Sequence, residues 1–152
     1  MVNALIDRGA DVNAPTTKPE YEKLTPLMVA SVYGRLELMR VLLAAGAKVN
    51  QANVDGGTAL MTASVRGQVE AIRVLLAAGA QVNQADADGL NALILASQFG
   101  RVQAFTALLA AGADPRLVAT NGASALGVAQ NNKHTTIVSL LQAKLAQLAG
   151  SA

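Results

Sequence analysis

A single period of 33 residues organises the chain. Gly46, Gly79 and Gly112 stand 33 residues apart, and each is followed by alanine. A second set of positions, which carry hydroxyl or amide side chains, keeps the same step: Thr25, Thr58, Asn91 and Ser124. A fixed period between 20 and 50 residues is typical of proteins in which copies of one small unit stack on each other.

Each copy contains two short helical patterns followed by a polar segment. In the second full copy, apolar residues recur at helical spacing over residues 59–66 and again over residues 69–78. Gly67 and Gly79 follow these patterns, and glycine readily adopts the left-handed backbone conformation common at helix ends. The polar residues 80–89 are rich in Asp, Asn and Gly, which predicts a turn-rich hairpin.

The same patterns predict helices near residues 26–33, 36–45, 59–66, 69–78, 92–99 and 102–111. Helices this short are marginal in isolation, because isolated helices under about 12–15 residues rarely persist in water. Each unit must therefore bury its apolar side against its neighbours. The sequence predicts an all-α stack held by contacts between adjacent units.

Two motifs recur in phase with this period. The first reads Thr-Pro-Leu-Met-Val-Ala at residues 25–30, with related versions at residues 58–63, 91–96 and 124–129. The second is a leucine pair followed by Gly-Ala, which occurs within residues 42–50, 75–83 and 108–114. Together these motifs resemble those of the ankyrin repeat family, and the resemblance covers nearly the whole chain.

The resemblance implies an ankyrin-repeat solenoid of helix-turn-helix units with β-hairpin fingers. The family's histidine in the first motif is replaced in every copy, by Met28, Met61, Ile94 and Gly127. We therefore expect each turn to lack the hydrogen bonds usually made between threonine, histidine and the backbone, without a change of fold. The differences between copies favour a natural array over a consensus design, and we expect a bacterial one.

We expect the chain to form one domain over residues 1–152, which the period divides into smaller parts. Its expected parts are a half repeat over residues 1–24, repeats over residues 25–57, 58–90 and 91–123, and a C-terminal capping repeat over residues 124–152. The half repeat lacks a first helix, so either a longer array has been cut or the chain starts on an unusual half-cap; we favour the cut. Without a polar cap, Leu5 and Ile6 are expected to be less buried than Leu75 and Leu76.

The first finger and the last repeat depart from the pattern. The finger over residues 13–24 is four residues longer than the others, which predicts an exposed loop that either contacts a partner or is a tolerated insertion. Asp114-Pro115 is expected to shorten the pairing of a later finger, because proline lacks the N–H that a strand donates.

In the last copy, Lys133 replaces the glycine between the two helices. A long second helix is expected from Thr135 to about Leu148. Gln142, Lys144 and Gln147 on that helix are predicted to face water, as a terminal capping repeat requires.

Composition and motifs exclude several other classes of protein. No apolar run reaches the roughly 18 residues that a membrane span needs, and the chain has no cysteine. The net charge is +2 without a cluster of basic residues, whereas nucleic-acid-binding proteins commonly carry a basic stripe. Asn3, Asp7 and Arg8 interrupt any secretory leader. We therefore predict no binding to nucleic acids or membranes and a cytoplasmic location, with a periplasmic or secreted one after leader removal left open.

The candidate catalytic groups have structural interpretations. His134 occupies the repeat position of Arg35, Gln68 and Arg101, and we expect all four to be exposed polar residues. Three serines also recur at the repeat period: Ser31, Ser64 and Ser97. We interpret them as structural residues of the repeat and not as nucleophiles. No phosphate-binding loop or paired-histidine motif is present. We predict no catalytic residue, no metal and no cofactor.

The positions at which the copies differ are the candidates for binding. In ankyrin-like proteins the partner usually contacts the finger tips and the end of each first helix. The corresponding residues are Tyr21, Glu22, Leu24, Val32, Tyr33, Val54, Asp55, Val65, Arg66, Asp88, Leu90, Gln98 and Phe99. Three of the four aromatic residues belong to this set, and aromatic and arginine side chains dominate interface energetics. The alternative is that Tyr33 and Phe99 pack against the next unit; Phe105, on the apolar face of a second helix, is expected in the core.

The predicted function is non-catalytic recognition of a partner protein on a concave surface of fingers and inner helices. One alternative is an accessory repeat region of a larger bacterial effector or enzyme whose active part lies outside this chain. Another is an enzyme or small-molecule binder, which would need a deep pocket with converging polar groups. We expect a monomer, with self-association through the uncapped half repeat as the alternative.

Overall fold

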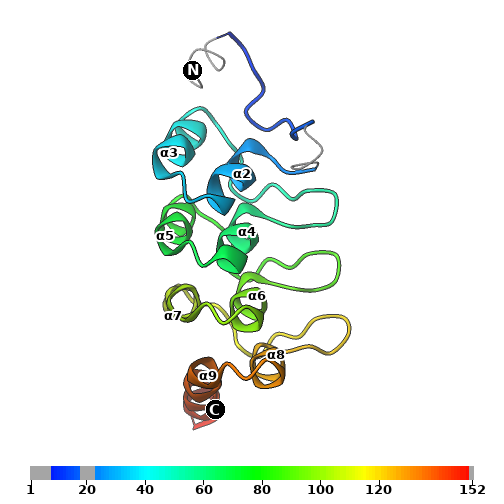
Figure 1. The fold of residues 1–152 in the computed structure, drawn as a ribbon, viewed down its shortest axis with the longest axis vertical. Coiled ribbons are helices and arrows are strands. Elements are labelled where there is room, and N and C mark those ends of the chain that lie inside the picture. Colours follow the sequence, from blue (N-terminus) through cyan, green and yellow to red (C-terminus); the bar gives the residue numbers. More distant parts are fainter. Residues whose placement is uncertain (1–7, 18–22, 151–152) are drawn as a thin grey trace.

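The computed structural model describes residues 8–17 and 23–150, and the helices of this part form two parallel rows (Figure 1). The inner row consists of α2 (Pro26–Val32), α4 (Ala59–Arg66), α6 (Ala92–Gln98) and α8 (Ala125–Asn131). The outer row consists of α3 (Leu36–Ala44), α5 (Val69–Ala77), α7 (Val102–Ala110) and α9 (Thr135–Gly150). The six helices expected from the period are confirmed, each to within one residue at its end.

The helices contact their neighbours in the stack. Each inner helix packs on the outer helix of its own repeat. Adjacent inner helices also pack on each other, as do adjacent outer helices. The fingers project from the inner row, on the side away from the outer row (Figure 1). The stacked arrangement predicted from the period is therefore confirmed.

Equivalent apolar positions of successive repeats make up one continuous core. The largest buried side chain, Phe105, lies on an outer helix, and Met39 and Ile72 of the outer helices are also completely buried. Alanines recur at one position of the inner helices, and Ala63 and Ala96 at this position have no exposed surface. Their small side chains let neighbouring helices approach closely. Phe105 is 0 % exposed, as predicted. Full burial of one such large apolar side chain contributes about 1.5–3 kcal/mol to stability.

The first residue of each motif caps an inner helix. The side-chain oxygen of Thr58 accepts a hydrogen bond from the Met61 N–H, and Asn91 accepts one from the Ile94 N–H at 2.9 Å. Such a cap is typically worth about 1 kcal/mol. In the first full copy, the Thr25 N–H also donates to the Met28 sulfur at 3.4 Å. The loss of the histidine therefore leaves the helix starts capped.

The fingers are hairpin-shaped but contain little regular strand. In the described residues, the backbone pairing appears as two isolated antiparallel bridges, Ala85 with Asn91 and Val118 with Ser124. The expectation that Pro115 shortens the last finger is wrong, since this finger keeps the same bridge as the one before it. Pro115 is buried at the base of the finger, outside the paired region.

The last repeat carries a longer second helix than the other described repeats. Helix α9 begins at Thr135, as expected, and extends to Gly150, two residues beyond the expected end. Gln142 and Gln147 are exposed as predicted, whereas Lys144 is half-buried, so the prediction for Lys144 is confirmed only in part. The aliphatic stem of a lysine can pack along apolar surface while its ammonium group stays in water, which accounts for this partial burial.

Lys133 adopts a backbone conformation that favours glycine. Its φ is +60°, close to the +70° of Gly67 at the equivalent turn of an earlier repeat. A left-handed conformation costs a non-glycine residue about 1–2 kcal/mol. We expect Lys133→Gly to raise the free energy of unfolding by about 0.5–1 kcal/mol, because glycine's greater freedom in the unfolded chain offsets part of the gain.

Urea denaturation of the wild type, Lys133→Gly and Lys133→Ala would measure this effect. The alanine variant keeps the strain and serves as the matched control. Equal stabilisation by both substitutions would show that the lysine side chain, rather than its backbone conformation, is unfavourable.

Some predictions concern residues outside the described part. These are the burial of Leu5 and Ile6 and the binding roles of Tyr21 and Glu22.

Candidate partner-binding surface

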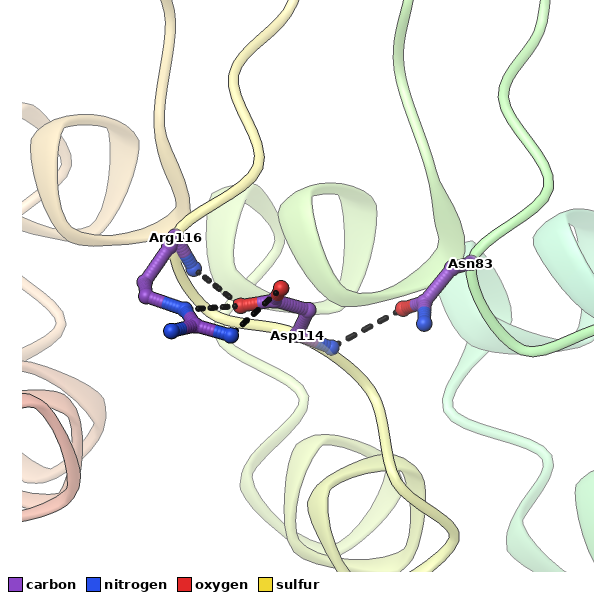
Figure 2. Close-up of polar contacts among 3 residues, drawn as sticks. All are labelled: Asn83, Asp114 and Arg116. Carbon is purple, nitrogen blue, oxygen red and sulfur yellow. Dashed lines mark hydrogen bonds and ion pairs between the residues drawn. The ribbon is translucent and has the colours of Figure 1, made fainter. Parts of the chain in front are cut away.

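Asparagine side chains join each finger to the next one. The side-chain oxygen of Asn13 accepts a hydrogen bond from the Lys48 N–H at 2.8 Å, and that of Asn50 accepts one from the Gln81 N–H at the same distance. Asn83 continues the series by accepting from the N–H of Asp114 at 2.9 Å (Figure 2). These bonds hold the finger bases of successive repeats in fixed register.

The asparagine series ends at Arg116, which occupies the next equivalent position. Its side chain turns back to Asp114 of the same finger, as Figure 2 shows. The guanidinium donates from Nε to Oδ1 at 2.9 Å and from Nη2 to Oδ2 at 3.1 Å, and the Arg116 N–H also donates to Oδ1. The side-chain hydrogen bonds from Arg116, followed by the one from its backbone, lower the pKa of the Asp114 carboxyl.

The lowered pKa of Asp114 predicts a pH dependence of stability. A carboxyl whose pKa is depressed on folding stabilises the native state above its unfolded pKa of about 3.9, and this contribution disappears as the pH falls through the folded pKa. We expect Arg116→Ala to raise the pKa of Asp114 only part of the way towards its unfolded value, because the backbone N–H at position 116 still donates a hydrogen bond to the carboxylate. NMR titration of the Asp114 side-chain carbon would measure the shift, with Arg73→Ala as the control. An unchanged pKa in Arg116→Ala would contradict the assignment to the guanidinium.

A second series of side chains joins the inner helices. Gln68 Nε2 donates to the Val32 carbonyl at 3.1 Å, and Arg101 Nε donates to the Val65 carbonyl at 2.8 Å. His134 occupies the equivalent position, with its Nε2 3.0 Å from the carbonyl oxygen of Gln98. Each bond ties a repeat to the end of the preceding inner helix.

These contacts correct the expectation that His134, Gln68 and their equivalents are simply exposed. Gln68 and His134 are half-buried, although Arg35 and Arg101 are exposed as predicted. The missed signal was the recurrence, at the repeat period, of side chains that can donate to a carbonyl. The interpretation of the serines is confirmed, since Ser64 is buried and donates to the Leu60 carbonyl within its own helix.

Tyr33, Arg66 and Phe99 lie at the ends of α2, α4 and α6, beside the carbonyls held by this second series. Tyr33 and Phe99 directly follow their helices, and Arg66 is the last residue of α4. Tyr33 is 51 % exposed and Phe99 44 %, and Arg66 is also exposed. The three residues are therefore accessible from solvent at the ends of three successive helices of one row.

The remaining predicted binding residues differ in exposure. Val54 is 71 % exposed, and Asp55 and Asp88 on the finger tips are also exposed. The half-buried members are Leu24, Val32, Val65, Leu90 and Gln98. We call Val54, Asp55, Asp88, Tyr33, Arg66 and Phe99 the finger-side surface.

An open groove on the outer row was not singled out by the sequence. Its apolar lining includes Leu76 of α5 and Val102 of α7. Its single carboxylate, Glu70, is paired with Arg73 on the same helix, and no histidine lines the groove. Its other polar side chains are Gln68, Gln103 and Thr106. Residues 8–17 and 23–150 also contain no group of three or more His, Cys, Asp or Glu side chains that could hold a metal ion.

The two-row stack with regularly spaced fingers defines a helical repeat protein of the solenoid class. The family model for ankyrin repeats, which describes three copies, matches residues 1–86 and 27–119. The chain belongs to the ankyrin repeat family. Ankyrin repeats are generally protein–protein interaction modules and are typically non-catalytic. No curated protein matches the chain. Among the described helices, none is both long and apolar enough to span a membrane.

Proposed function

We propose that this chain is a non-catalytic binding module that recognises a partner protein on the finger-side surface. The observation that carries the proposal is the exposure of Tyr33 and Phe99 on either side of Arg66. Water-exposed aromatic rings are costly unless another surface covers them, and Tyr, Trp and Arg are the residues most enriched among binding hot spots.

The rigidity of the scaffold supports the same proposal. The side-chain bonds of Gln68, Arg101 and His134 hold the helix ends that carry the exposed residues. A surface that is already ordered loses little conformational entropy on association, so more of the contact energy appears as affinity. We also propose that residues 1–152 act as one domain, since each helix pair depends on its neighbours for burial.

The combined substitution Tyr33→Ala, Arg66→Ala and Phe99→Ala tests the proposal. A partner would be isolated from the source organism by affinity capture and identified by mass spectrometry, and its affinity then measured by calorimetry. We expect the triple variant to bind at least 100-fold more weakly, a loss of about 2.8 kcal/mol, because hot-spot truncations commonly cost 2 kcal/mol or more.

The matched control removes similar side chains from other faces. Arg40→Ala, Arg73→Ala and Leu140→Ala truncate exposed residues of the outer row, and the first two each lose only an exposed ion pair. Such pairs are worth about 0.2–1 kcal/mol, so the control should remain folded and keep the wild-type affinity. Equal affinities of the triple variant and the wild type would refute the proposed surface.

A further inference from the structure

The tips of three successive fingers share one dipeptide pattern. Asp55-Gly56, Asp88-Gly89 and Asn121-Gly122 occupy equivalent positions, 33 residues apart. Asn121 is the only asparagine of the sequence that glycine follows. Glycine has no Cβ atom to shield its backbone nitrogen, so this nitrogen can reach the side chain of the residue before it. The finger that precedes α8 (Figure 1) therefore carries a pair of residues suited to an intramolecular reaction of the asparagine side chain.

A side chain braces the turn in the two preceding fingers but not in this one. The Oδ1 atom of Asp86 accepts hydrogen bonds from the N–H groups of Asp88 and Leu90, both at 2.9 Å. Asn53 braces the finger before it in the same way. Ala119 occupies the equivalent position in the last finger and has no side-chain oxygen, so this turn lacks the brace.

The following finger also clamps the peptide group after each aspartate. The Asp88 carbonyl accepts hydrogen bonds from the N–H and the Oγ1 of Thr120, both at 2.9 Å, and the Asp55 carbonyl accepts an N–H of the next finger at 3.1 Å. No donor among the described residues bonds to the Asn121 carbonyl, and no atom lies within 4 Å of a Cβ added at Gly122. The peptide plane after Asn121 can therefore rotate without breaking a bond to another finger.

The Asn121 carboxamide already lies over the backbone that follows it. Its Oδ1 atom accepts the Ala123 N–H at 3.0 Å. When a nitrogen attacks the Cγ atom, negative charge develops on Oδ1, and a backbone N–H aimed at this oxygen stabilises the charge. Asn121 and Gly122 are both exposed, so hydroxide and water reach them. The Gly122 N–H donates to the Ala119 carbonyl at 2.9 Å, a bond that recurs in all three fingers and that the reaction must break.

We propose that Asn121 is a site of spontaneous deamidation and that the contacts between fingers protect the two earlier tips from the equivalent ring closure. The Gly122 nitrogen gives its proton to hydroxide and bonds to the Cγ atom of Asn121. The bond from Cγ to Nδ2 breaks, and the departing nitrogen takes a proton from water and leaves as ammonia. Water then opens the cyclic imide at one of its two carbonyls, which gives aspartate or isoaspartate. Asparagine is among the residues that limit the lifetime of proteins at high temperature.

The products change the tip of the last finger. Either one adds a carboxylate at the position equivalent to Asp55 and Asp88, and the net charge falls from +2 to +1. The isoaspartate also lengthens the main chain by one methylene group, inside a turn that the hydrogen bond from the Ala119 N–H to the Ala123 carbonyl closes at 2.8 Å. This inference goes beyond the proposed function and does not depend on it.

Peptide mapping of the folded chain tests the proposal. The chain would be incubated at mildly alkaline pH, digested with trypsin at intervals and analysed by mass spectrometry. Trypsin releases residues 117–133 as one peptide, and fragmentation separates Asn121 from Asn131 and Asn132. We expect deamidation at position 121 to be at least tenfold faster than at any other asparagine. Gly122→Ala should slow it at least tenfold, because the added side chain shields the nitrogen.

Asp88→Asn provides the matched comparison within one molecule, since it creates the same dipeptide at a tip that the next finger clamps. In the folded variant, position 88 should deamidate at least tenfold more slowly than position 121. In concentrated urea, where the contacts between fingers are absent, the two positions should react at similar rates. Circular dichroism would establish that the variant is folded before the incubation.

Two outcomes would contradict the proposal. A deamidation rate at Asn121 no higher than at the other asparagines of the folded wild type would overturn the site itself. A ratio of the rates at positions 121 and 88 that is the same in the folded variant and in urea would overturn the protection by finger contacts. Neither outcome bears on the proposed partner-binding surface, because neither measures binding.

Discussion

Replacing Phe105 by alanine should lower the free energy of unfolding by about 3–5 kcal/mol. Phe105 is the largest of the fully buried side chains, and it lies in α7 within the continuous core. Truncation removes the transfer energy of the ring and leaves a cavity that neighbouring helices fill only in part. For a domain whose stability is of the order of 5–15 kcal/mol, the loss amounts to a large fraction of the total.

Phe99→Ala is the matched control, because it removes the same side chain from an exposed position. Surface substitutions usually change stability by no more than about 0.5 kcal/mol, so this variant should unfold near the wild-type midpoint. Urea denaturation followed by circular dichroism would compare the two variants. Similar losses for both would contradict the assignment of one ring to the core and the other to the binding surface. A stable Phe99→Ala also permits its use in the binding experiments.

Gly89→Ala is expected to destabilise the stack by about 1–2 kcal/mol from backbone strain and by a further 1–3 kcal/mol from steric overlap. Gly89 has a φ of +78°, which a side chain disfavours. A Cβ atom at this position would also come within 2.9 Å of the Thr120 nitrogen and 3.1 Å of the Ala119 Cα in the next finger. Both contacts are with backbone, which cannot move aside as a flexible side chain could.

Gly122 provides the control for the steric part of this prediction. It occupies the equivalent position in the last finger, with a φ of +81°, but an added Cβ would meet no atom within 4 Å. Gly122→Ala should therefore cost only the backbone strain of about 1–2 kcal/mol. Equal losses for the two variants, measured by thermal or urea denaturation, would show that the finger-to-finger contact contributes nothing.

The sequence predicted the elements of this fold because each depends on local chemistry. The apolar spacing over residues 59–66 and 69–78 predicts two helices, and Thr58 and Gly67 mark the limits of the first; the structure has α4 and α5 there. The burial of Phe105 follows from its place on the apolar face of a helix. The predicted binding positions rest on a comparison of equivalent positions between copies, and the sequence alone supplies that comparison.

The contacts between repeats needed the tertiary structure. Gln68 and His134 were expected to be exposed, yet both are half-buried against carbonyls 36 residues earlier in the chain. Whether a polar side chain finds such an acceptor depends on the rise and rotation between units, which a repeat period does not specify. The outer groove, which the sequence did not indicate, is likewise a product of this geometry.

The 33-residue period, the helices and the capping residues follow from the sequence by itself, because they depend on hydrophobic spacing and backbone preferences within one unit. The tertiary structure determined which polar groups join the units and which aromatic residues stay exposed. It also placed backbone of the next finger close to a Cβ added at Gly89, whereas no atom lies close to one added at Gly122. Those features depend on how one unit lies on the next, and packing between residues far apart in the chain determines that arrangement.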